Sequence, residues 1–397
     1  MSFTNLPLSY CTNVHPGRTV DEVIDGLNQY TAAVRRSVDL PIAAGLWLSQ
    51  STVTELLESE AKLERLGQTL WQNDLTCHTL NAFPYGDFHS DRVKEQVYLP
   101  DWADNTRLKY TQSCARILAQ LMPENSEGSI STLPLGGTMN PSEPDFHAKC
   151  FKNLIRCARF LKELHEETGR MIRLAVEPEP LCHISSIRGD AVPQFRAIYE
   201  MADALGNEAE VREHIGLCLD VCHQAVEFET LPVSIDQLDD EGIRINKVHI
   251  TNAVELVKPA ANKEAIEALK GFVEPRYLHQ VFAKMADGSI EKRLDLTQEF
   301  LADTSDTLFA ADAWRIHFHV PIFAETIGSL NTTRSDLQAA LTRIARLPYA
   351  PHLEVETYTW PVMPNTAEPD GNDLVAQIAG ELQSTFEILL AASKASS

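Results

Sequence analysis

One apolar stretch of the sequence ends in two residues that can bind a divalent metal. It reads Gly216-Leu-Cys-Leu-Asp-Val-Cys-His223, so a carboxylate at Asp220 is followed three residues later by an imidazole. Apolar residues of this kind build a strand of a parallel sheet. Carboxylate and imidazole groups at the carboxyl end of such a strand are suitable metal ligands. Alone, the motif indicates only a metal-binding pair.

Three other apolar segments end in the same residue types. They are Arg173-Leu-Ala-Val-Glu177, Lys247-Val-His249 and His352-Leu-Glu-Val-Glu356. Successive residues of a strand point to opposite faces, so the acidic and imidazole side chains point inward when the apolar residues pack outward. Both Glu354 and Glu356 meet this condition, and Glu356 lies about 7 Å nearer the carboxyl end. The pattern does not choose between them as the metal ligand.

These strand ends predict a metal site in which Glu177, Asp220, His249 and Glu356 form one ring with His223. Three buried carboxylates repel one another and shift their pKa values unless a cation neutralises them. Each residue alone is more often an ordinary hydrogen-bonded side chain, but four successive strand ends favour a metal. The ligand types allow Mn²⁺, Zn²⁺, Co²⁺ or Fe²⁺, and we expect one to three ions.

Further histidines are candidate ligands around this ring. The segment Trp314-Arg-Ile-His-Phe-His-Val places His317 and His319 on one face of an extended chain, which suits a second metal. A pair of hydrogen-bonded residues lining the barrel explains them equally well. His279, in a long connection, and His78, in the segment Thr76-Cys-His-Thr, are additional candidates.

The elements that must position these residues are short apolar segments separated by amphipathic ones. The candidate strands are residues 9–15, 42–49, 75–83, 129–135, 172–177, 215–221, 243–250, 314–320 and 352–358. Between them, apolar residues recur at helical spacing, for example from Phe151 to Leu164 before Gly169 and from Phe195 to Leu205 before Gly206. Alternating strands and helices predict an α/β fold with parallel strands, a (β/α)8 TIM barrel. Eight strands close the barrel, and one of the nine is left over.

Two connections, at about 85–128 and 252–312, are too long to be simple loops. We interpret both as insertions at the carboxyl-terminal face of a single domain spanning 1–397, because neither shows enough strands for a core of its own. Such insertions tend to cover the catalytic face of a barrel.

The composition excludes several other classes of protein. The formal net charge is −22, from 34 Lys and Arg against 56 Asp and Glu, which argues against a nucleic-acid partner. No apolar run reaches the length of a membrane span, and the start lacks the features of a secretory signal. The 8 cysteines are scattered without a CxxC pair, as in a reduced cytoplasmic protein. The motifs of nucleophilic hydrolases, phosphate-binding loops and dinucleotide-binding folds are missing.

The strand ends resemble the xylose isomerase-like TIM-barrel superfamily of sugar isomerases, ketose 3-epimerases and zinc-dependent AP endonucleases. In that superfamily a Glu, an Asp-x-x-His, a His and a Glu hold the metal, and the resemblance assigns these roles to Glu177, Asp220 with His223, His249 and Glu356. It also implies that His78, His317 and His319 stand in for the additional ligands of the AP endonuclease branch.

More narrowly, the whole chain resembles the metabolite traffic protein EboE family. The motifs that carry this resemblance are Tyr10-Cys-Thr-Asn-Val-His-Pro-Gly17, Leu80-Asn-Ala-Phe-Pro-Tyr-Gly86, Val97-Tyr-Leu-Pro-Asp-Trp102 and Leu353-Glu-Val-Glu-Thr-Tyr-Thr-Trp360. The resemblance implies a part in moving or processing precursors of secondary metabolites, and it names no reaction.

We therefore expect a metal-dependent isomerase or epimerase whose partner is a small polyhydroxylated or carbonyl metabolite. Glu177 and Glu356 would exchange a proton with the substrate carbon, and His223 would orient the substrate or polarise its oxygen. The alternatives are a hydrolase or phosphoesterase with several metals, which the surplus histidines favour, and a carrier that binds a metabolite without catalysis. The oligomeric state, the substrate and the metal are not predicted.

Overall fold

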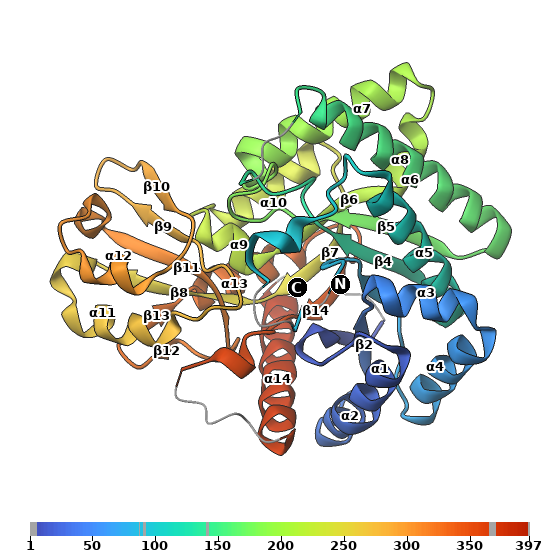
Figure 1. Cartoon of the computed structure of the whole chain (residues 1–397), viewed down its shortest axis with the longest axis horizontal. Helices are drawn as coiled ribbons and strands as arrows, with labels where there is room; N and C mark the ends of the chain where they lie inside the picture. Colours follow the sequence, from blue (N-terminus) through green and yellow to red (C-terminus); the bar gives the residue numbers. More distant parts are fainter. Residues whose placement is uncertain (1–5, 87, 90–92, 140–142, 365–370, 396–397) are drawn as a thin grey trace.

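Eight parallel strands close into a barrel in the computed structural model, which describes residues 6–86, 88–89, 93–139, 143–364 and 371–395 (Figure 1). Around the barrel the order is β1-β14-β7-β6-β5-β4-β3-β2. The strands are β1 (Leu8–Cys11), β2 (Ile42–Trp47), β3 (Thr79–Asn81), β4 (Glu127–Thr132), β5 (Met171–Val176), β6 (Ile215–Asp220), β7 (Ile245–Ile250) and β14 (His352–Val355). The predicted (β/α)8 fold is confirmed.

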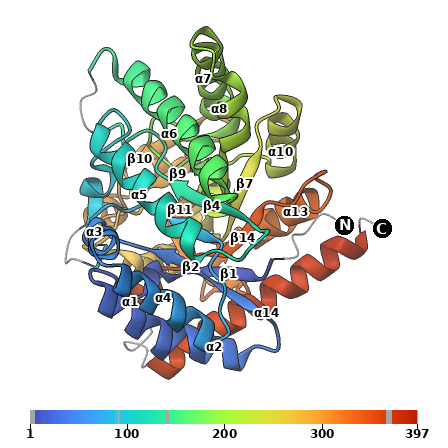
Figure 2. The ribbon, with the colours of Figure 1, turned by 90° about the vertical axis from the view of Figure 1, so that its right-hand side faces the viewer.

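Helices connect the strands and cover the outside of the barrel, as Figure 2 shows from the side. They are α1 (Val20–Gly26), α2 (Ala32–Ser37), α3 (Gln50–Glu58), α4 (Glu60–Gln72), α5 (Asn105–Leu121), α6 (Phe146–Thr168), α7 (Val192–Ala204), α8 (Glu208–His214), α9 (Val221–Val226), α10 (Leu231–Asp240), α13 (Arg334–Ile344) and α14 (Gly371–Ala395). The two helices predicted from apolar spacing are α6 and α7. Each is followed by a glycine with a positive φ, 71° at Gly169 and 69° at Gly206, which ends the helix as expected.

A second sheet follows β7 and stands beside the barrel. Its six strands pair antiparallel in the order β10-β9-β11-β8-β13-β12. They are β8 (Asn252–Val257), β9 (Val281–Lys284), β10 (Ile290–Arg293), β11 (Ala313–Val320), β12 (Thr326–Ile327) and β13 (Leu330–Thr332), with α11 (Lys263–Leu269) and α12 (Gln298–Ala302) between them. We call this segment, residues 252–333, the lobe. Most of its buried apolar residues belong to one cluster with those of the barrel.

The lobe extends beyond the insertion predicted at about 252–312. That segment contributes β8, β9 and β10, and β11, β12 and β13 complete the sheet up to Thr332. Strands such as β10, with the sequence Ile-Glu-Lys-Arg, are short and largely exposed, so they carry no apolar run. The candidate strand left over from the barrel is 314–320, which is β11 of this sheet. The other long connection, 85–128, contains a short 3-10 helix (Lys94–Tyr98) and α5, the crossover helix between β3 and β4.

None of the helices in the described part of the chain is both long enough and apolar enough to cross a membrane.

The register of the parallel strands aligns the residues that carry the chemistry. Asp220 at the end of β6 pairs with His249 of β7, and His249 pairs with Glu354 of β14. These three side chains therefore lie at one level of the barrel. Glu356 comes two residues later, just beyond the end of β14, and reaches further toward the mouth.

A buried ion pair lies inside the barrel below this level. Lys247 Nζ is 2.8 Å from Glu354 Oε1 and 2.9 Å from Asn81 Oδ1, and the side chains of Lys247 and Glu354 are both fully buried. Asn81 Nδ2 donates to Glu354 Oε1 at 2.8 Å, and Ser9 Oγ donates to Oε2 at 3.1 Å. Burial raises the pKa of Glu354, but Lys247 and His249 together outweigh it, so the pKa falls to about 2. Glu354 is therefore a fixed anion at neutral pH.

We expect Gly45→Ala to break this ion pair. A Cβ at position 45 of β2 would lie 1.5 Å from Glu354 Oε2, so the carboxylate would have to leave Lys247. A buried charge left without its partner costs roughly 3–5 kcal/mol. Urea unfolding should show a loss of this size.

Gly67→Ala is the matched control. Its Cβ would lie 3.7 Å from Leu121 Cδ2, an ordinary contact on α4, and helical Ala is about 0.5–1 kcal/mol better than Gly. Equal stability of the Gly45→Ala and wild-type proteins would show that the Lys247–Glu354 pair is not constrained as described.

Candidate metal centre

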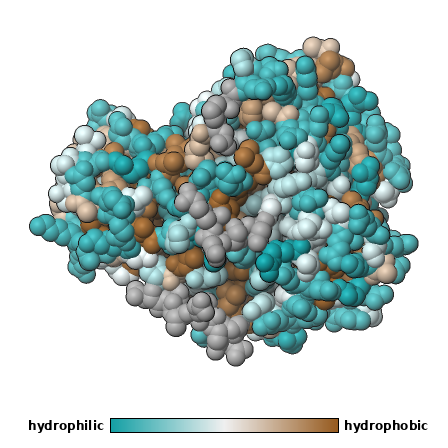
Figure 3. All heavy atoms as spheres, viewed as in Figure 1, coloured by the Kyte–Doolittle hydropathy of each residue, from teal (hydrophilic) through white to brown (hydrophobic). Residues whose placement is uncertain are grey.

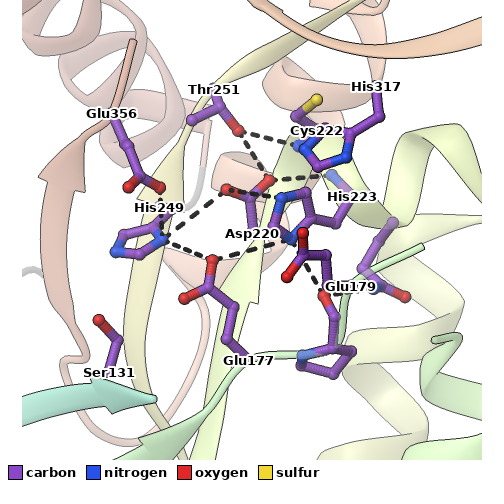
Figure 4. Close-up of polar contacts among 12 residues, drawn as sticks. Ser131, Glu177, Glu179, Asp220, Cys222, His223, His249, Thr251, His317 and Glu356 are labelled. Atoms are coloured by element: carbon purple, nitrogen blue, oxygen red, sulfur yellow. Dashed lines mark hydrogen bonds and ion pairs between the residues drawn. The ribbon is translucent and has the colours of Figure 1, made fainter. Parts of the chain in front are cut away.

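Four buried side chains converge at the carboxyl ends of β5, β6, β7 and β14. Glu177, Asp220, His249 and Glu356 each offer one ligand atom, and these atoms all lie within 4.8 Å of one another. His249 Nδ1 is 2.9 Å from Glu177 Oε1, 2.9 Å from Glu356 Oε2 and 3.7 Å from Asp220 Oδ2 (Figure 4). The structure thus brings together the four predicted strand-end residues. We call this group the ring.

Helix capping positions Asp220 and explains the Asp-x-x-His spacing. Asp220 is the N-cap of α9, and its Oδ1 accepts a hydrogen bond from the backbone N–H of His223 at 2.9 Å. Thr251 Oγ1 donates to the same oxygen at 2.9 Å. The other oxygen, Oδ2, is buried and has no hydrogen-bond partner among the described residues. A buried carboxylate oxygen without a partner is costly, and a cation would satisfy it.

His249 lies between the ring and Glu354. Its Nε2 lies 3.4 Å from Glu354 Oε1 without forming a hydrogen bond, and Lys247 fixes that carboxylate from below. A carboxylate behind a ligating histidine is the usual support of a metal-bound imidazole. Burial alone lowers the pKa of His249, but Cys218, Glu177 and the other nearby acids raise it well above its ordinary value. The ring therefore attracts positive charge.

Glu354, in β14, and Glu356, just after it, lie at different depths in the barrel. Glu354 lies below the ring with Lys247, whereas Glu356 is part of the ring. Glu356 Oε1 accepts from Asn13 Nδ2 at 2.8 Å, and Oε2 faces His249. Burial raises the pKa of Glu356, but His249 outweighs it and lowers the pKa. Glu356 is therefore the one that fits a metal ligand.

Another buried carboxylate, Glu381 on α14, accepts hydrogen bonds from the loop that carries Glu356. Glu381 Oε1 accepts from Thr357 Oγ1 at 2.7 Å, and Oε2 accepts from Trp360 Nε1 at 3.1 Å. The backbone N–H of Ile322, in the lobe, donates to Oε1 at 3.2 Å. Burial raises the pKa of Glu381 to about 7. This residue ties α14, the lobe and the ring together.

The ring fits a divalent cation. It offers oxygens from three carboxylates and one imidazole nitrogen, all buried, and Asp220 Oδ2 lacks any other partner. The same residue types bind Mn²⁺, Zn²⁺, Co²⁺ and Fe²⁺, and the oxygen-rich set favours Mn²⁺ more than a histidine-rich set would. Glu177, Asp220, His249 and Glu356 would hold the ion.

His223 lies outside the ring, in a group with His317 and His319. The centroid of its imidazole is 4.5 Å from that of His317 and 5.5 Å from that of His319. Burial lowers the pKa of His223, but Asp220 and Glu179 outweigh it and raise the pKa. Burial lowers the pKa values of His317 and His319. The sequence placed His223 in the ring, and the structure divides the residues into two adjacent groups.

The structure does not bring His279 and His78 into either group. His279 Nε2 lies 2.8 Å from Glu274 Oε1 and Nδ1 lies 3.0 Å from the carbonyl of His317, so both nitrogens are occupied. His78 precedes β3 and packs edge-on against His352, with 4.9 Å between the centroids, at the amino-terminal end of the barrel. Burial lowers the pKa of His78 to about 4.

Sequence reasoning missed Glu179. It follows the ring residue Glu177 by two positions in Glu177-Pro-Glu179, and Tyr98 Oη donates to its Oε1 at 2.7 Å. Burial raises the pKa of Glu179 to about 7. Its adjacency to Glu177 was the available signal, but no strand pattern places a residue beyond a strand end.

A pocket opens onto both groups. Its floor is polar, with Glu177, Glu179, Glu356, His223, His317 and His319. Its upper wall comes from the segments after β3 and after β14 and from the lobe, and is mostly apolar or aromatic: Phe83, Pro84, Phe88, Val93, Val97, Tyr98, Tyr277, Leu278 and Tyr358. Figure 3 shows a mostly hydrophilic surface on one face of the molecule, with apolar side chains gathered where the lobe meets the barrel.

No protein-family model and no curated protein matches the sequence. Several solved structures share the architecture. A D-tagatose 3-epimerase-like protein has a TM-score of 0.49 and 10% identity, over 98% of this chain and 99% of that one. The IolI protein with a binding zinc atom has a TM-score of 0.46 and 13% identity, over 98% of each chain. An AP endonuclease of family 2 from Brucella melitensis has a TM-score of 0.37 and 15% identity, over 62% of this chain and 79% of that one. Similarities at this level carry no functional argument, so the assignment of the site rests on its own geometry.

We expect Glu381→Gln to remove a pH dependence of stability. An acid whose pKa is raised by folding is favourable while protonated, so its contribution is lost as the pH rises from about 4.5, its ordinary pKa, through about 7. From pH 5 to pH 8 the variant should gain roughly 2–3 kcal/mol relative to wild type in urea unfolding. Glu291→Gln, on the exposed strand β10, should show no such change. If the difference in free energy of unfolding between wild type and Glu381→Gln stays constant with pH, Glu381 is not a buried acid that is neutral below pH 7.

We also expect Glu356→Gln to weaken metal binding at the ring by 100-fold or more, because one anionic ligand is lost while the bond from Asn13 can be kept. Calorimetric titration of chelator-treated protein with Mn²⁺ measures this. Glu291→Gln is again the control. Mn²⁺ affinity that is the same in Glu356→Gln and wild type would remove Glu356 from the ligand set.

Proposed function

We propose that the protein is a metal-dependent isomerase or epimerase that moves a proton on a carbon next to an oxygen of a small polyhydroxylated or carbonyl metabolite. The observation that carries this proposal is the pair of carboxylates, Glu177 and Glu356, that flank His249 Nδ1 at 2.9 Å each on the pocket floor. A cation held by the ring would polarise the substrate oxygens and so acidify the neighbouring C–H bond.

The two glutamates have unequal surroundings, which supports different roles. Asn13 Nδ2 donates to Glu356 Oε1 at 2.8 Å, a bond that a cation held by the ring would leave in place, so this carboxylate is held. The hydrogen bond of Glu177 to His249 is made by Oε1. Glu177 Oε2 is therefore the better base to take the proton from the substrate carbon and return it to the neighbouring carbon, and Glu356 is the group that positions the substrate.

The pocket wall supports a substrate without a phosphate group. Among its described lining residues the one permanently charged cation is Lys94, whose Nζ pairs with Asp295 and donates to the carbonyl of Tyr277 at 3.2 Å. Recognition of a phosphate normally uses arginine or lysine side chains, or a helix N-terminus. The apolar and aromatic upper wall instead favours a metabolite with an apolar or planar face opposite its oxygens.

The resemblance to the EboE family gives this activity a setting. Processing or traffic of a secondary-metabolite precursor is consistent with a substrate that has both chelating oxygens and an apolar face. A hydrolase remains the second candidate, because three imidazoles lie directly beside the ring. A carrier without catalysis would not require a free oxygen on Glu177.

We expect the Mn²⁺- or Co²⁺-loaded protein to exchange solvent deuterium into the carbon beside a carbonyl or hydroxyl group of its substrate. The panel should contain free ketoses and aldoses together with aryl-substituted hydroxyketones, and mass spectrometry should follow the exchange. Glu177→Gln should lower the exchange rate by roughly 10²–10⁴-fold, the usual contribution of a general base.

Two comparisons make this test decisive. Glu291→Gln should exchange at the wild-type rate, and Glu177→Gln, which lacks one anionic ligand of the ring, should stay slow even at Mn²⁺ concentrations that saturate its ring. Phosphoester hydrolysis by the loaded protein, with no exchange on any member of the panel, would replace the isomerase proposal by the hydrolase.

A further inference from the structure

The loop after β14 carries a tyrosine whose side chain lines the pocket. Tyr358 follows the ring residue Glu356 by two positions and is half-buried. Within the described part of the chain its hydroxyl makes no hydrogen bond, and the oxygen is not sealed from the pocket. A tyrosine hydroxyl in such a position usually has a partner. The free hydroxyl therefore points to a bound molecule as its partner.

Aromatic contacts fix the ring of Tyr358. Its centroid lies 4.7 Å from that of His319, 5.2 Å from that of Phe88 and 5.1 Å from that of Tyr277. Two of these residues come from the lobe, and Phe88 comes from the segment after β3. Tilted and edge-on packing of this kind restricts the orientation of an aromatic side chain. The direction of the hydroxyl is therefore set before a ligand arrives.

The backbone on both sides of Tyr358 is held as well. Thr357 Oγ1 donates to Glu381 Oε1 on α14 at 2.7 Å. Thr359 Oγ1 donates to the carbonyl of His319 on β11. The loop is thus bonded to the last helix of the barrel and to the lobe. A donor held in this way loses little conformational freedom on binding, which is the condition for strong electrostatic stabilisation.

Carboxylates lie near the Tyr358 hydroxyl. Burial raises the pKa of Tyr358 well above its ordinary value, and the charges of Glu179 and Glu356 raise it further. The hydroxyl therefore keeps its proton at neutral pH. Because Glu179 and Glu356 both belong to the pocket floor, the hydroxyl faces the floor rather than the surface.

This hydroxyl supplies a hydrogen-bond donor to a pocket whose floor is rich in acceptors. Four other side chains that line the pocket are donors, but each already donates to a protein acceptor: Asn13, Asn81, Lys94 and Tyr98. The carboxylates of the floor can only accept when they are ionised. An oxygen of the substrate that gains negative charge is repelled by them, so it needs a donor beside it.

We propose that Tyr358 Oη donates a hydrogen bond to the substrate oxygen on which negative charge builds up while Glu177 removes the proton. The proton moves from the substrate carbon to Glu177 Oε2, and the phenolic proton stays on Tyr358. A fixed donor at a developing charge stabilises the transition state more than the ground state. This inference rests on the function proposed above, to which it adds a catalytic residue.

The variant Tyr358→Phe tests the proposal, because it removes the hydroxyl and keeps the ring. In the Mn²⁺-loaded protein, deuterium exchange at saturating substrate should slow by about 10²-fold, the usual loss for one such donor. Mn²⁺ affinity and urea unfolding should not change. Acetohydroxamate provides a readout without the reaction, because it chelates a metal through two oxygens and carries a negative charge. Calorimetry should show roughly 10-fold weaker binding to the loaded variant than to the loaded wild type.

Tyr30→Phe is the matched control. It makes the same change at a tyrosine that stacks on His15 outside the pocket, and it should behave as wild type. Equal acetohydroxamate affinity in Tyr358→Phe and wild type would overturn the proposal, whatever the exchange rates. Wild-type binding of acetohydroxamate that does not depend on Mn²⁺ would also overturn it. Weaker acetohydroxamate binding in Tyr358→Phe, with no exchange on any compound of the panel, would support the contact and overturn the isomerase reaction alone.

Discussion

The confinement of three carboxylates in one buried ring is the constraint on which the rest of the site depends. Glu177, Asp220 and Glu356 lie within ligand distance of one another and away from water. Like charges at such distances are tolerable only if positive charge is close by. The raised pKa of His249 is the protein's own response to this requirement. A divalent cation meets it more fully, because it also gives Asp220 Oδ2 a partner.

The barrel separates its buried charges by depth. Glu354 lies beside His249 in the strand register, yet it is neutralised from below by Lys247 and donated to by Asn81 and Ser9. A fourth uncompensated carboxylate in the ring would raise the repulsion further. Paired with Lys247, Glu354 instead orients His249 from behind. Gly45 makes this possible, since any side chain there would occupy the space of the Glu354 carboxylate.

The barrel strands and the helices between them could be predicted from the sequence, because their apolar residues recur at regular spacing. Alternation of apolar and polar residues identified the strand ends, and in a closed parallel barrel those ends must meet, so Glu177, Asp220, His249 and Glu356 were found. Their partners could not be found in this way. Contacts such as Asn13 with Glu356, or Tyr98 with Glu179, join loops far apart in the chain, and no local pattern encodes them.

The histidines show the same limit. His78 shares a residue type with the ring, but it precedes β3 and so lies at the wrong end of the barrel. His279 reaches the right region, but Glu274 and the carbonyl of His317 occupy its nitrogens. His317 and His319 were recognised as a pair on one strand. Their strand was taken as a possible barrel strand. A buried strand of eight residues has the same sequence pattern in a parallel barrel as in the centre of an antiparallel sheet.

Asp220 explains why the two groups meet where they do. As the N-cap of α9 it must present one oxygen to the N–H of His223, and Thr251 shares that oxygen. Capping therefore fixes Oδ1, leaves Oδ2 free, and sets His223 on the first turn of α9, beyond the strand end. His249, one strand away, approaches Oδ2 from within the barrel, while β11, whose pairing with β8 shifts in register between Ile316 and Val320, places His319 on the side of His223. A local rule of helix geometry thus divides the strand-end residues into an oxygen-rich group inside the barrel and a nitrogen-rich group between the barrel and the lobe.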